Sequence, residues 1–346
     1  MRPIGTIFSS HDVPFLIAEV GLGHDGSLGT AHAFIDAVAT TGVDAIKFQT
    51  HIAAAESTPD EPFRVRFSPA DATRYAYWER TGFSESQWAD LKRHAEERGL
   101  TFLSSPFSLE AVELLERLDI AAWKVASGEL GSRRMLERMA ATGKPLLLSS
   151  GMSGFDELER LTTWLRPLCP DRLAVLQCTT SYPTPAAAVG LNVVDQYARR
   201  LGCPVGLSDH SGTPWPAVIA AWLGARVIEV HVTFSRHMFG PDVSSSLTIE
   251  DLARLVEGVT FAHAMRTSPI DKDAAAADKA PLRRMFGKSA VARRNLAAGE
   301  AVGDDDVAFL KPGGGLTEQE FDALAGHPLL RSVPAGNLIH IEDFQS

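Results

Sequence analysis

Two histidines lie at the ends of predicted buried strands and could bind one metal ion. His210 follows the segment PVGLSD, and His231 lies near the end of VIEVHV. Neutral imidazole is a common metal ligand. With no third histidine or cysteine nearby, the site would keep open positions for water and substrate oxygen, which favours Mn²⁺ or Mg²⁺ over structural zinc. The alternative is that both rings form hydrogen bonds to the backbone or to Asp209.

Two lysines hold comparable positions in other predicted strands. Lys47 in DAIKFQ and Lys124 in AAWKVAS would point into one cavity, which costs repulsion and desolvation unless an anion lies between them. We therefore expect a bound phosphate or carboxylate. Hydroxyl groups at strand ends could donate to its oxygens, namely those of Ser127, Ser149 and Ser208. Each serine could instead be a turn or capping residue.

Two glutamates complete the candidate catalytic set. Glu19 and Glu129 end the first and fourth predicted strands. Near the lysines they would stay ionised and could act as general bases, so that Glu19, Glu129, His210 and His231 are the candidate catalytic residues. Their alternative role is to neutralise Lys47 and Lys124.

The elements that must position these residues alternate regularly. Eight short apolar runs alternate with helix-patterned segments between residues 15 and 263, as in parallel α/β proteins. Eight such units in about 250 residues predict an α/β fold of the (β/α)8 TIM-barrel class, which places catalytic groups at the C-terminal ends of its strands. The predicted strands are FLIAEV, DAIKFQ, LTFLSS, AAWKVAS, PLLLSS, LAVLQC, PVGLSD and VIEVHV.

Turn residues, helix-capping residues and changes in composition divide the chain into further segments. Residues 1–265 are expected to form the catalytic barrel, 266–287 a linker with a short helix, and 288–346 a small β-rich domain with Gly and Pro turns. Ser84 and Gln87 form a capping-box pattern at the start of a helix. The Pro-rich segment 50–80 is too long for a plain connection and is expected to be a functional loop over one end of the barrel.

Composition excludes several classes of function. The chain has 346 residues and a formal net charge of −10, so its surface as a whole repels nucleic acid and anionic membranes. Three cysteines without C-x-x-C spacing argue against a disulfide framework or a zinc site. The sequence shows no signal peptide and no apolar run of about 18 residues. We expect a cytoplasmic protein that binds neither nucleic acid nor membranes.

The motifs as a set are similar to a known family. AEVGLGHDGSLGTA, IKFQT, LSSPFS, WKVASGE, LLSSGMS, CTTSYPTP, GLSDHSGT and IEVHVTFSRHMFGPD follow one another in this order. They resemble the sialic acid (N-acetylneuraminate) synthase family, which includes legionaminate and pseudaminate synthases. The segment KSAVARRNLAAGEAV with FLKPGGGL resembles its C-terminal antifreeze-like (SAF) domain, a β-clip fold. The likeness spans nearly the whole chain.

This resemblance implies a transferase of carbohydrate biosynthesis. Such an enzyme condenses phosphoenolpyruvate with the open-chain aldehyde of a hexose derivative, usually an N-acylated mannosamine, to give a 2-keto-3-deoxy acid and phosphate by C–O cleavage. It implies a domain-swapped homodimer in which the antifreeze-like domain of one chain covers the barrel of the other. By the same likeness, phosphoenolpyruvate would bind to Lys47, Lys124, Ser127, Ser149 and Ser208, a divalent ion to His210 and His231, and the sugar to Gln49, Tyr182, Asp242 and Lys311.

Two departures from the family pattern concern the sugar side. Gly23 replaces an asparagine, and Lys311 in LKPGGG replaces an arginine; lysine lacks the planar fork of arginine. We therefore expect an acceptor other than plain N-acetylmannosamine. The alternatives are another metal-dependent TIM-barrel sugar isomerase or lyase, and a non-catalytic sugar-binding, regulatory or ice-binding protein on the same scaffold.

Overall fold

The computed structural model describes residues 1–9, 12–63 and 66–344. The chain divides into two compact units, Met1–Ser268 and Pro269–Ser346. Within the described residues, no helix combines the length and apolar character needed to cross a bilayer.

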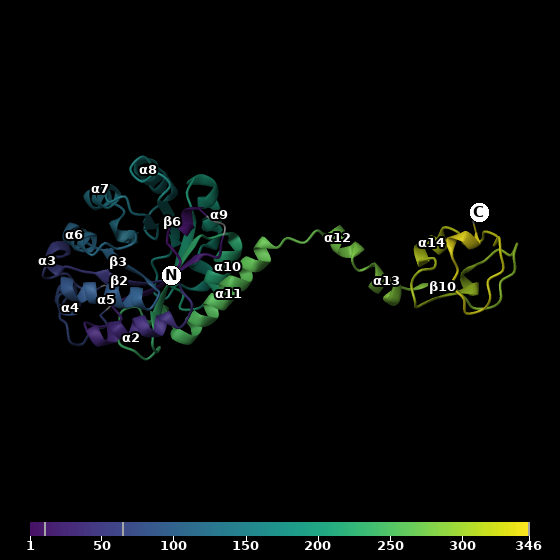
Figure 1. Cartoon of the computed structure of the whole chain (residues 1–346), viewed down its shortest axis with the longest axis horizontal. Helices are drawn as coiled ribbons and strands as arrows, with labels where there is room; N and C mark the ends of the chain where they lie inside the picture. Colours follow the sequence, from purple (N-terminus) through teal and green to yellow (C-terminus); the bar gives the residue numbers. More distant parts are fainter. Residues whose placement is uncertain (10–11, 64–65, 345–346) are drawn as a thin grey trace. The chain divides into compact units, whose positions relative to one another are not determined.

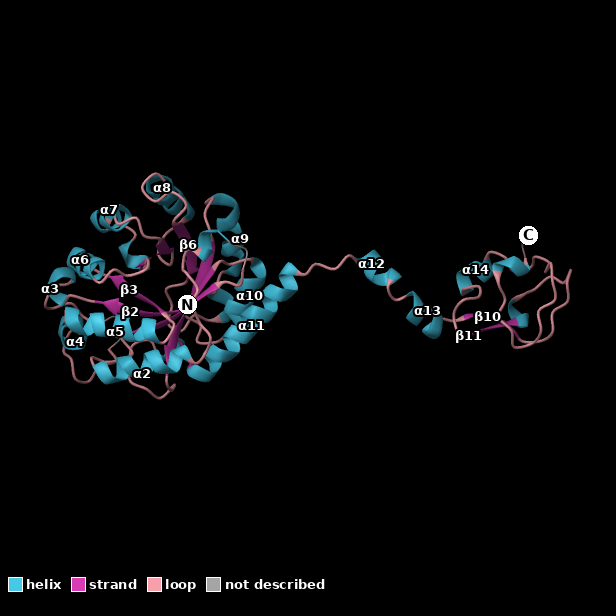
Figure 2. Cartoon of the chain, viewed as in Figure 1, coloured by secondary structure: helices cyan, strands magenta, loops and turns pink. Residues whose placement is uncertain are grey.

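The first unit is a nearly closed barrel of eight parallel strands with helices around it (Figures 1 and 2). The hydrogen-bonded order is β3-β2-β1-β8-β7-β6-β5-β4, and β3 packs against β4 to complete the ring. The predicted TIM-barrel class is confirmed, and a short strand β9 (Ser246–Thr248) also pairs with β8. The barrel strands are β1 Phe15–Gly21, β2 Ala45–Thr50, β3 Thr101–Pro106, β4 Trp123–Val125, β5 Leu146–Ser149, β6 Leu173–Cys178, β7 Val205–Asp209 and β8 Val227–Thr233.

Side-chain alternation divides the barrel interior into a floor and a site. Successive residues of a strand point to opposite faces, so every second residue enters the barrel. In β1, Phe15 and Ile17 belong to a buried apolar cluster with Val227 of β8, and Ile4 and Ile7 belong to the same cluster. Positions two residues further along each strand are polar. The apolar floor keeps water from the lower barrel and leaves the polar groups at its C-terminal end.

The helices form the outer layer. Helix α5 begins after Ser84, whose hydroxyl accepts from the backbone of Gln87 in a capping box, and the chain turns at Gly99 with a φ of +81°, which glycine adopts without strain. Its residues Trp88 and Leu91 pack into the main core. The helices of this unit are α1 Thr6–Ser9, α2 Leu28–Ala39, α3 Ala53–Glu56, α4 Arg74–Thr81, α5 Glu85–Glu97, α6 Leu109–Arg117, α7 Arg133–Ala141, α8 Phe155–Leu165, α9 Leu191–Arg200, α10 Trp215–Leu223 and α11 Ile249–Thr267.

The segment 50–80 carries two of these helices, α3 and α4. Tyr77 and Trp78 of α4 form a buried cluster with Ala53 and Leu22, and Phe63 packs against it. This cluster is separate from the main core. It holds a wall of aromatic and charged side chains beside the C-terminal ends of the strands.

The second unit contains two short helices and a small β-rich body. Helices α12 (Lys272–Ala277) and α13 (Ala280–Phe286) precede the antiparallel pair β10 (Ser289–Ala292) and β11 (Val307–Leu310). Helix α14 (Glu318–Asp322) follows, and its Phe321 lies in the apolar core of this unit.

Candidate active site

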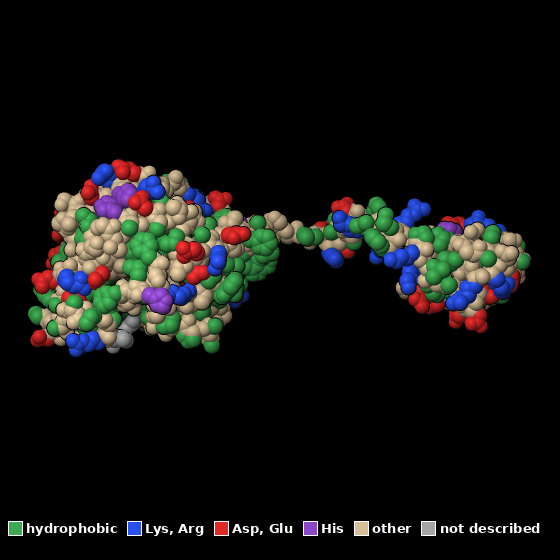
Figure 3. All heavy atoms as spheres, turned by 90° about the horizontal axis from the view of Figure 1, so that it is seen from below, with side chains coloured by type: hydrophobic (Ala, Val, Ile, Leu, Met, Phe, Trp, Pro, Cys, Tyr) green, Lys and Arg blue, Asp and Glu red, His purple; other side chains and the backbone are tan. Residues whose placement is uncertain are grey.

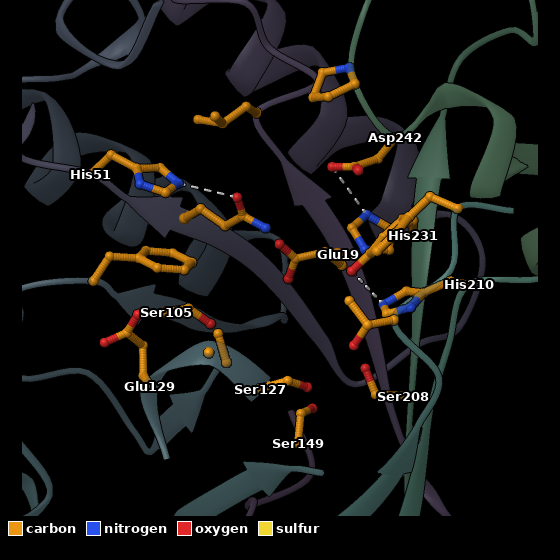
Figure 4. Close-up of a pocket in the computed structure, with 18 of the residues that line it drawn as sticks. Glu19, His51, Ser105, Ser127, Glu129, Ser149, Ser208, His210, His231 and Asp242 are labelled. Atoms are coloured by element: carbon orange, nitrogen blue, oxygen red, sulfur yellow. Dashed lines mark hydrogen bonds and ion pairs between the residues drawn. The ribbon is translucent and has the colours of Figure 1, made fainter. Parts of the chain in front are cut away.

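A cavity of about 560 Å³ opens at the C-terminal ends of the barrel strands (Figure 4). Small-molecule sites usually enclose roughly 300–1,000 Å³. The structure brings together every site residue that the sequence predicted within the barrel, although their chemical roles stay predictions. The cavity is lined by Glu19, Lys47, Gln49, Lys124, Ser127, Glu129, Ser149, Tyr182, Ser208, His210, His231 and Asp242.

Strand register places three of these residues in one row. Glu19 of β1 is paired with Lys47 of β2 on one side and with His231 of β8 on the other. Register partners on neighbouring parallel strands point to the same face, so all three side chains enter the barrel. Lys47 and Glu19 form an ion pair, with side chains 3% and 1% exposed.

A carboxylate that the sequence analysis missed lies between the two lysines. Glu229 Oε1 is 3.4 Å from Lys124 Nζ, and its Oε2 is 3.8 Å from Lys47 Nζ. Ser208 Oγ donates to Glu229 Oε1 at 3.0 Å. The expectation that the lysine pair requires a bound anion was therefore incomplete, because the protein supplies a carboxylate of its own. Glu229 alternates with Val227 and His231 in β8, and this period of two could have identified it.

The two central carboxyls have opposite protonation tendencies. Burial raises the pKa of Glu19 to about 7, with Lys47 opposing the rise and Glu229 adding to it. Burial would also raise the pKa of Glu229, but Lys124 and Lys47 outweigh it and lower this pKa to about 2. Glu229 is thus a permanent anion at neutral pH, whereas Glu19 can exchange a proton there.

The predicted serines lie around the lysines and their neighbours. Lys124 Nζ donates to Ser149 Oγ at 2.6 Å. Lys47 Nζ donates to Ser105 Oγ at 3.1 Å, a hydroxyl that the sequence analysis did not include among the anion ligands. Ser127 Oγ accepts from the backbone of Gly151 at 2.9 Å. Together these groups form a polar surface able to donate several hydrogen bonds to an anion.

The rings of the two histidines are neighbours in the cavity, with centroids 5.3 Å apart and planes tilted by 54°. Nδ1 of His210 lies 2.9 Å from the carbonyl oxygen of Thr179. A carbonyl only accepts, so this nitrogen carries the hydrogen and Nε2 keeps its lone pair. Tyr182 stacks on His210, with its hydroxyl 3.2 Å from that Nε2.

His231 offers a second buried nitrogen. Its Nδ1 has no hydrogen-bond partner among the described residues and lies 3.9 Å from Asp242 Oδ2 (Figure 4). Burial lowers the pKa of both histidines to about 4; the neighbouring imidazole adds to the effect at His210, and Glu229 opposes it at His231. Both rings are therefore neutral at pH 7, the form that binds metal ions.

These observations fit a divalent ion held by two imidazoles, with its other positions left to water or substrate. Within the described part of the chain, no group of three or more His, Cys, Asp or Glu residues is arranged to hold a metal ion. The donor set expected from the sequence, His210 and His231, stays a prediction.

Glu129 lies apart from the row formed by Glu19, Lys47 and His231. Its Oε2 accepts from Ser132 Oγ at 2.8 Å, and partial burial raises its pKa. Among the described ion pairs, Glu129 forms none with Lys47 or Lys124. Of the two predicted glutamates, only Glu19 has the lysine contact that the alternative interpretation required.

The cavity has a further wall whose residues the sequence analysis did not name. It consists of side chains from segment 50–80 and from the loop after β3: His51, Glu56, Glu61, Phe63, Phe67, Arg74, Tyr77, Trp78 and Phe107. The length of segment 50–80 predicted a functional loop over one end of the barrel; its residues line the cavity, and their function stays a prediction. Its side chains could not be ranked from sequence because their positions depend on how α3 and α4 pack.

The two residues that depart from the family pattern, Gly23 and Lys311, are not among those that line the cavity. The α-carbon of Gly23 faces the backbone oxygen of Val20, which an added Cβ would approach to 3.0 Å. Lys311 belongs to the second unit, where it follows β11 exposed to solvent with Nζ 5.3 Å from the ring centroid of Phe286.

Comparison with known proteins gives two family matches. A family model described as the NeuB family matches residues 34–270, and a model described as the SAF domain matches residues 287–345. The matches together cover most of both compact units.

Individual relatives match along nearly their whole length. The N-acetylneuraminate-9-phosphate synthase of Homo sapiens is 32% identical, covering 94% of this chain and 91% of that protein. The N,N'-diacetyllegionaminic acid synthase of Legionella pneumophila is 29% identical, covering 95% and 94%. The crystal structure of N-acetylneuraminic acid (sialic acid) synthetase from Leptospira borgpetersenii, in complex with citrate, has a TM-score of 0.69 at 24% identity and covers 80% of this chain and 93% of that one. This structural likeness supports the fold.

Proposed function

The chain belongs to the NeuB family of synthases and carries a SAF domain, and we propose from this that it condenses phosphoenolpyruvate with an open-chain hexose-derived aldehyde. The products would be a sialic-acid-like 2-keto-3-deoxy sugar acid and phosphate. One observation carries the proposal: two buried lysines flank one carboxylate beside two neutral, neighbouring imidazoles in a single cavity.

Phosphoenolpyruvate would bind on the side of the lysines. Lys47 and Lys124 supply the positive charge, and hydroxyls around them donate to phosphate and carboxylate oxygens. Glu229 lies within ion-pair distance of both lysines and so holds their ammonium groups in place before the substrate arrives. The hydroxyl donors in this proposal are Ser127, Ser149 and Ser208, with Ser105 added by the structure.

His210 and His231 would hold a divalent ion, Mn²⁺ or Mg²⁺. When bound, such an ion polarises the aldehyde oxygen toward attack by C3 of the enol. The two rings are kept neutral by burial, and Thr179 fixes the tautomer of His210 through its carbonyl oxygen.

Glu19 is the best-placed group to move protons. Its pKa of about 7 suits proton exchange at neutral pH. C3 of phosphoenolpyruvate forms a bond to the aldehyde carbon, whose oxygen takes a proton and becomes a hydroxyl. Water then adds at C2 and loses one proton. As the C–O bond breaks, phosphate leaves with the bond electrons, and the new C2 hydroxyl gives its remaining proton to the phosphate and becomes the C2 ketone. Glu19 could give the first proton and accept the second, with Glu129 as the second proton-handling candidate.

The acceptor would lie between the histidines and the wall from segment 50–80. Gln49, Tyr182 and Asp242 line this side. Relatives are named for neuraminate 9-phosphate and for diacetyllegionaminate synthesis, so the family accepts differently substituted sugars. Because Lys311 stands where the family has arginine, we propose an acceptor other than plain N-acetylmannosamine.

The working form would be a domain-swapped homodimer. In this proposal residues 1–265 form the catalytic barrel, 266–287 the linker, and 288–346 the antifreeze-like domain that covers the partner's barrel. A large apolar face on α10 and α11 supports a partner; it comprises Trp215, Ile219, Trp222, Phe261 and Met265, each 48–69% exposed. Hydrophobic side chains lie at the surface near the end of α11, where the linker begins (Figure 3). Exposed apolar patches of this kind mark protein interfaces.

Phosphate release from phosphoenolpyruvate tests the function directly. The purified chain is incubated with Mn²⁺ and a panel of N-acylated mannosamines, their 6-phosphates and mannose. Release that depends on one aldose, with a matching 2-keto acid product, supports the proposal. Best turnover on N-acetylmannosamine would end the idea of a changed acceptor. No release with any aldose would favour a non-catalytic binder, and aldose isomerisation or cleavage without phosphoenolpyruvate would favour an isomerase or lyase.

A further inference from the structure

His51 lies across the cavity from His210 and His231 and has no role in the steps described above (Figure 4). It directly follows β2. Its Nδ1 is 2.6 Å from Glu56 Oε1, and its Nε2 is 3.2 Å from Gln49 Oε1. The side chains of His51 and Glu56 are only 6% and 5% exposed. A buried histidine with a carboxylate on one nitrogen and a cavity residue on the other is in a position to orient that residue.

Two aromatic rings fix the plane of the imidazole. Trp78 of α4 stacks on His51 with ring centroids 4.8 Å apart and an interplanar angle of 10°. Phe107 stacks on it with centroids 4.2 Å apart at 15°. The ring therefore cannot tilt without losing a contact, and its two in-plane nitrogens must point at Glu56 and Gln49.

The hydrogen-bond pattern then determines how Gln49 presents its amide. Nε2 of His51 faces Oε1 of Gln49 rather than its amide nitrogen, and Nδ1 of His51 faces Glu56 Oε1. The amide NH₂ group is left for the cavity. A Cβ added at Gly21 would lie 3.4 Å from Gln49 Nε2, 3.4 Å from Glu19 Oε1 and 3.5 Å from Asp242 Oδ2. The amide nitrogen of Gln49 thus lies in the same part of the cavity as the carboxyl groups of Glu19 and Asp242.

We propose that His51, held by Glu56, is a positioning residue that keeps the N–H groups of Gln49 facing the cavity. The enzyme would then select acceptor sugars that present an oxygen lone pair, from a carbonyl or hydroxyl group, at this wall. This inference rests on the proposed function, because it takes Gln49 as part of the acceptor side.

The substitution His51→Phe separates positioning from packing. Phenylalanine keeps a flat ring between Trp78 and Phe107 but has neither nitrogen. With the aldose that gives the fastest phosphate release, we expect KM for the aldose to rise about tenfold and KM for phosphoenolpyruvate to change less than twofold. The matched variant Glu56→Gln keeps the shape of the carboxylate and should give a smaller rise in the same KM. An equal rise in both KM values would indicate a structural role and overturn the inference.

A double-variant comparison tests whether the effect passes through the amide. Gln49→Met removes the amide while keeping the length of the side chain. In that background His51→Phe should change KM for the aldose less than twofold, because its target is already gone. Independent losses that multiply in the double variant would refute the proposed route.

A measurement without turnover keeps this test separate from that of the function. If the wild-type chain releases no phosphate with any aldose, the proposed function is wrong, but the orientation of Gln49 is still measurable. In chain labelled with ¹⁵N-glutamine, the side-chain NH₂ signals of Gln49 are assigned by their absence from Gln49→Met. His51→Phe should increase their solvent exchange at least fivefold. Unchanged exchange would overturn the inference.

Discussion

Replacing Glu229 by glutamine should destabilise the barrel, whereas the same replacement at Glu19 should not. Both carboxyls are buried in the same layer, 4% and 1% exposed, and both contact Lys47. Lys124 and Lys47 overcome the effect of burial at Glu229 and lower its pKa from the ordinary 4.5 to about 2. That difference corresponds to about 3 kcal/mol of folding free energy at neutral pH.

The magnitude follows from leaving two lysines without their shared anion. Removing one partner of a buried ion pair typically costs about 3–5 kcal/mol. In a unit of this size each kcal/mol shifts the midpoint of thermal unfolding by about 2–4 °C, so Glu229→Gln should lower the midpoint by roughly 6–20 °C. Glu19 has its pKa raised to about 7, largely by burial. Its ionised form is therefore unfavourable in the folded chain, and Glu19→Gln should leave the midpoint at pH 8 unchanged or higher.

The pH dependence has a definite sign for each group. A depressed carboxyl pKa contributes stability that is present above 4.5 and is lost as the pH falls toward 2, so wild type should lose the Glu229 contribution in that window. A raised carboxyl pKa favours folding below 4.5, and this contribution is lost as the pH rises to about 7. Glu19→Gln should remove the decline between those values.

Thermal unfolding with and without phosphoenolpyruvate provides the assay. The substrate places negative charge beside Lys47 and Lys124, so it should raise the midpoint of Glu229→Gln by more than that of wild type, provided it still binds. Ser208→Ala, which removes one hydrogen bond to Glu229, should cost only about 1 kcal/mol and serves as the control. The reasoning is refuted if Glu229→Gln is as stable as wild type, or if Glu19→Gln is destabilised equally.

Further predictions concern activity and assembly. Glu19→Gln should lower kcat about 100-fold or more with little change in KM for phosphoenolpyruvate. Steady-state kinetics measures both constants, and a fall in both would contradict this prediction. Binding of phosphoenolpyruvate at pH 7.5 should take up a proton because its charge raises the pKa of Glu19 further; calorimetry in buffers of different ionisation enthalpy measures this uptake, which Glu19→Gln should abolish. A chelator should stop turnover and Mn²⁺ should restore it, whereas His231→Asn should need a higher Mn²⁺ concentration. Trp222→Glu places a charge in the exposed apolar face and should shift the chain toward monomer in sedimentation velocity; an unchanged mass would place the interface elsewhere.

The sequence was sufficient for the barrel and for residues at strand ends. Alternating runs set the number of strands, and parallel strands end at one rim, so His210 and His231 could be expected on neighbouring strands. The same reasoning, applied to the period of two within β8, would also have selected Glu229. The last polar residue of a strand does not identify it, because Glu229 lies inside the apolar run of β8, two residues before His231.

Other contacts depend on packing that local sequence does not determine. His51 and Gln49 are neighbours in sequence, but Trp78 and Phe107 reach the imidazole from α4 and from the loop after β3. Neither local propensity nor periodicity predicts that approach. The proposed role of Lys311 is a similar case, because it depends on the proposed partner chain.

The charge balance in the polar layer suggests why Glu19, rather than Glu229, would handle protons. Both carboxylates are near cations, yet Glu229 contacts two ammonium groups and Glu19 only one. A carboxyl shared by two cations gives up its proton too readily to act as an acid at neutral pH. Burial and the charge of Glu229 raise the pKa of Glu19 to about 7. An arriving phosphate ester would raise it further, and Glu19 would begin the reaction protonated, ready to protonate the aldehyde oxygen and then to accept the proton of water.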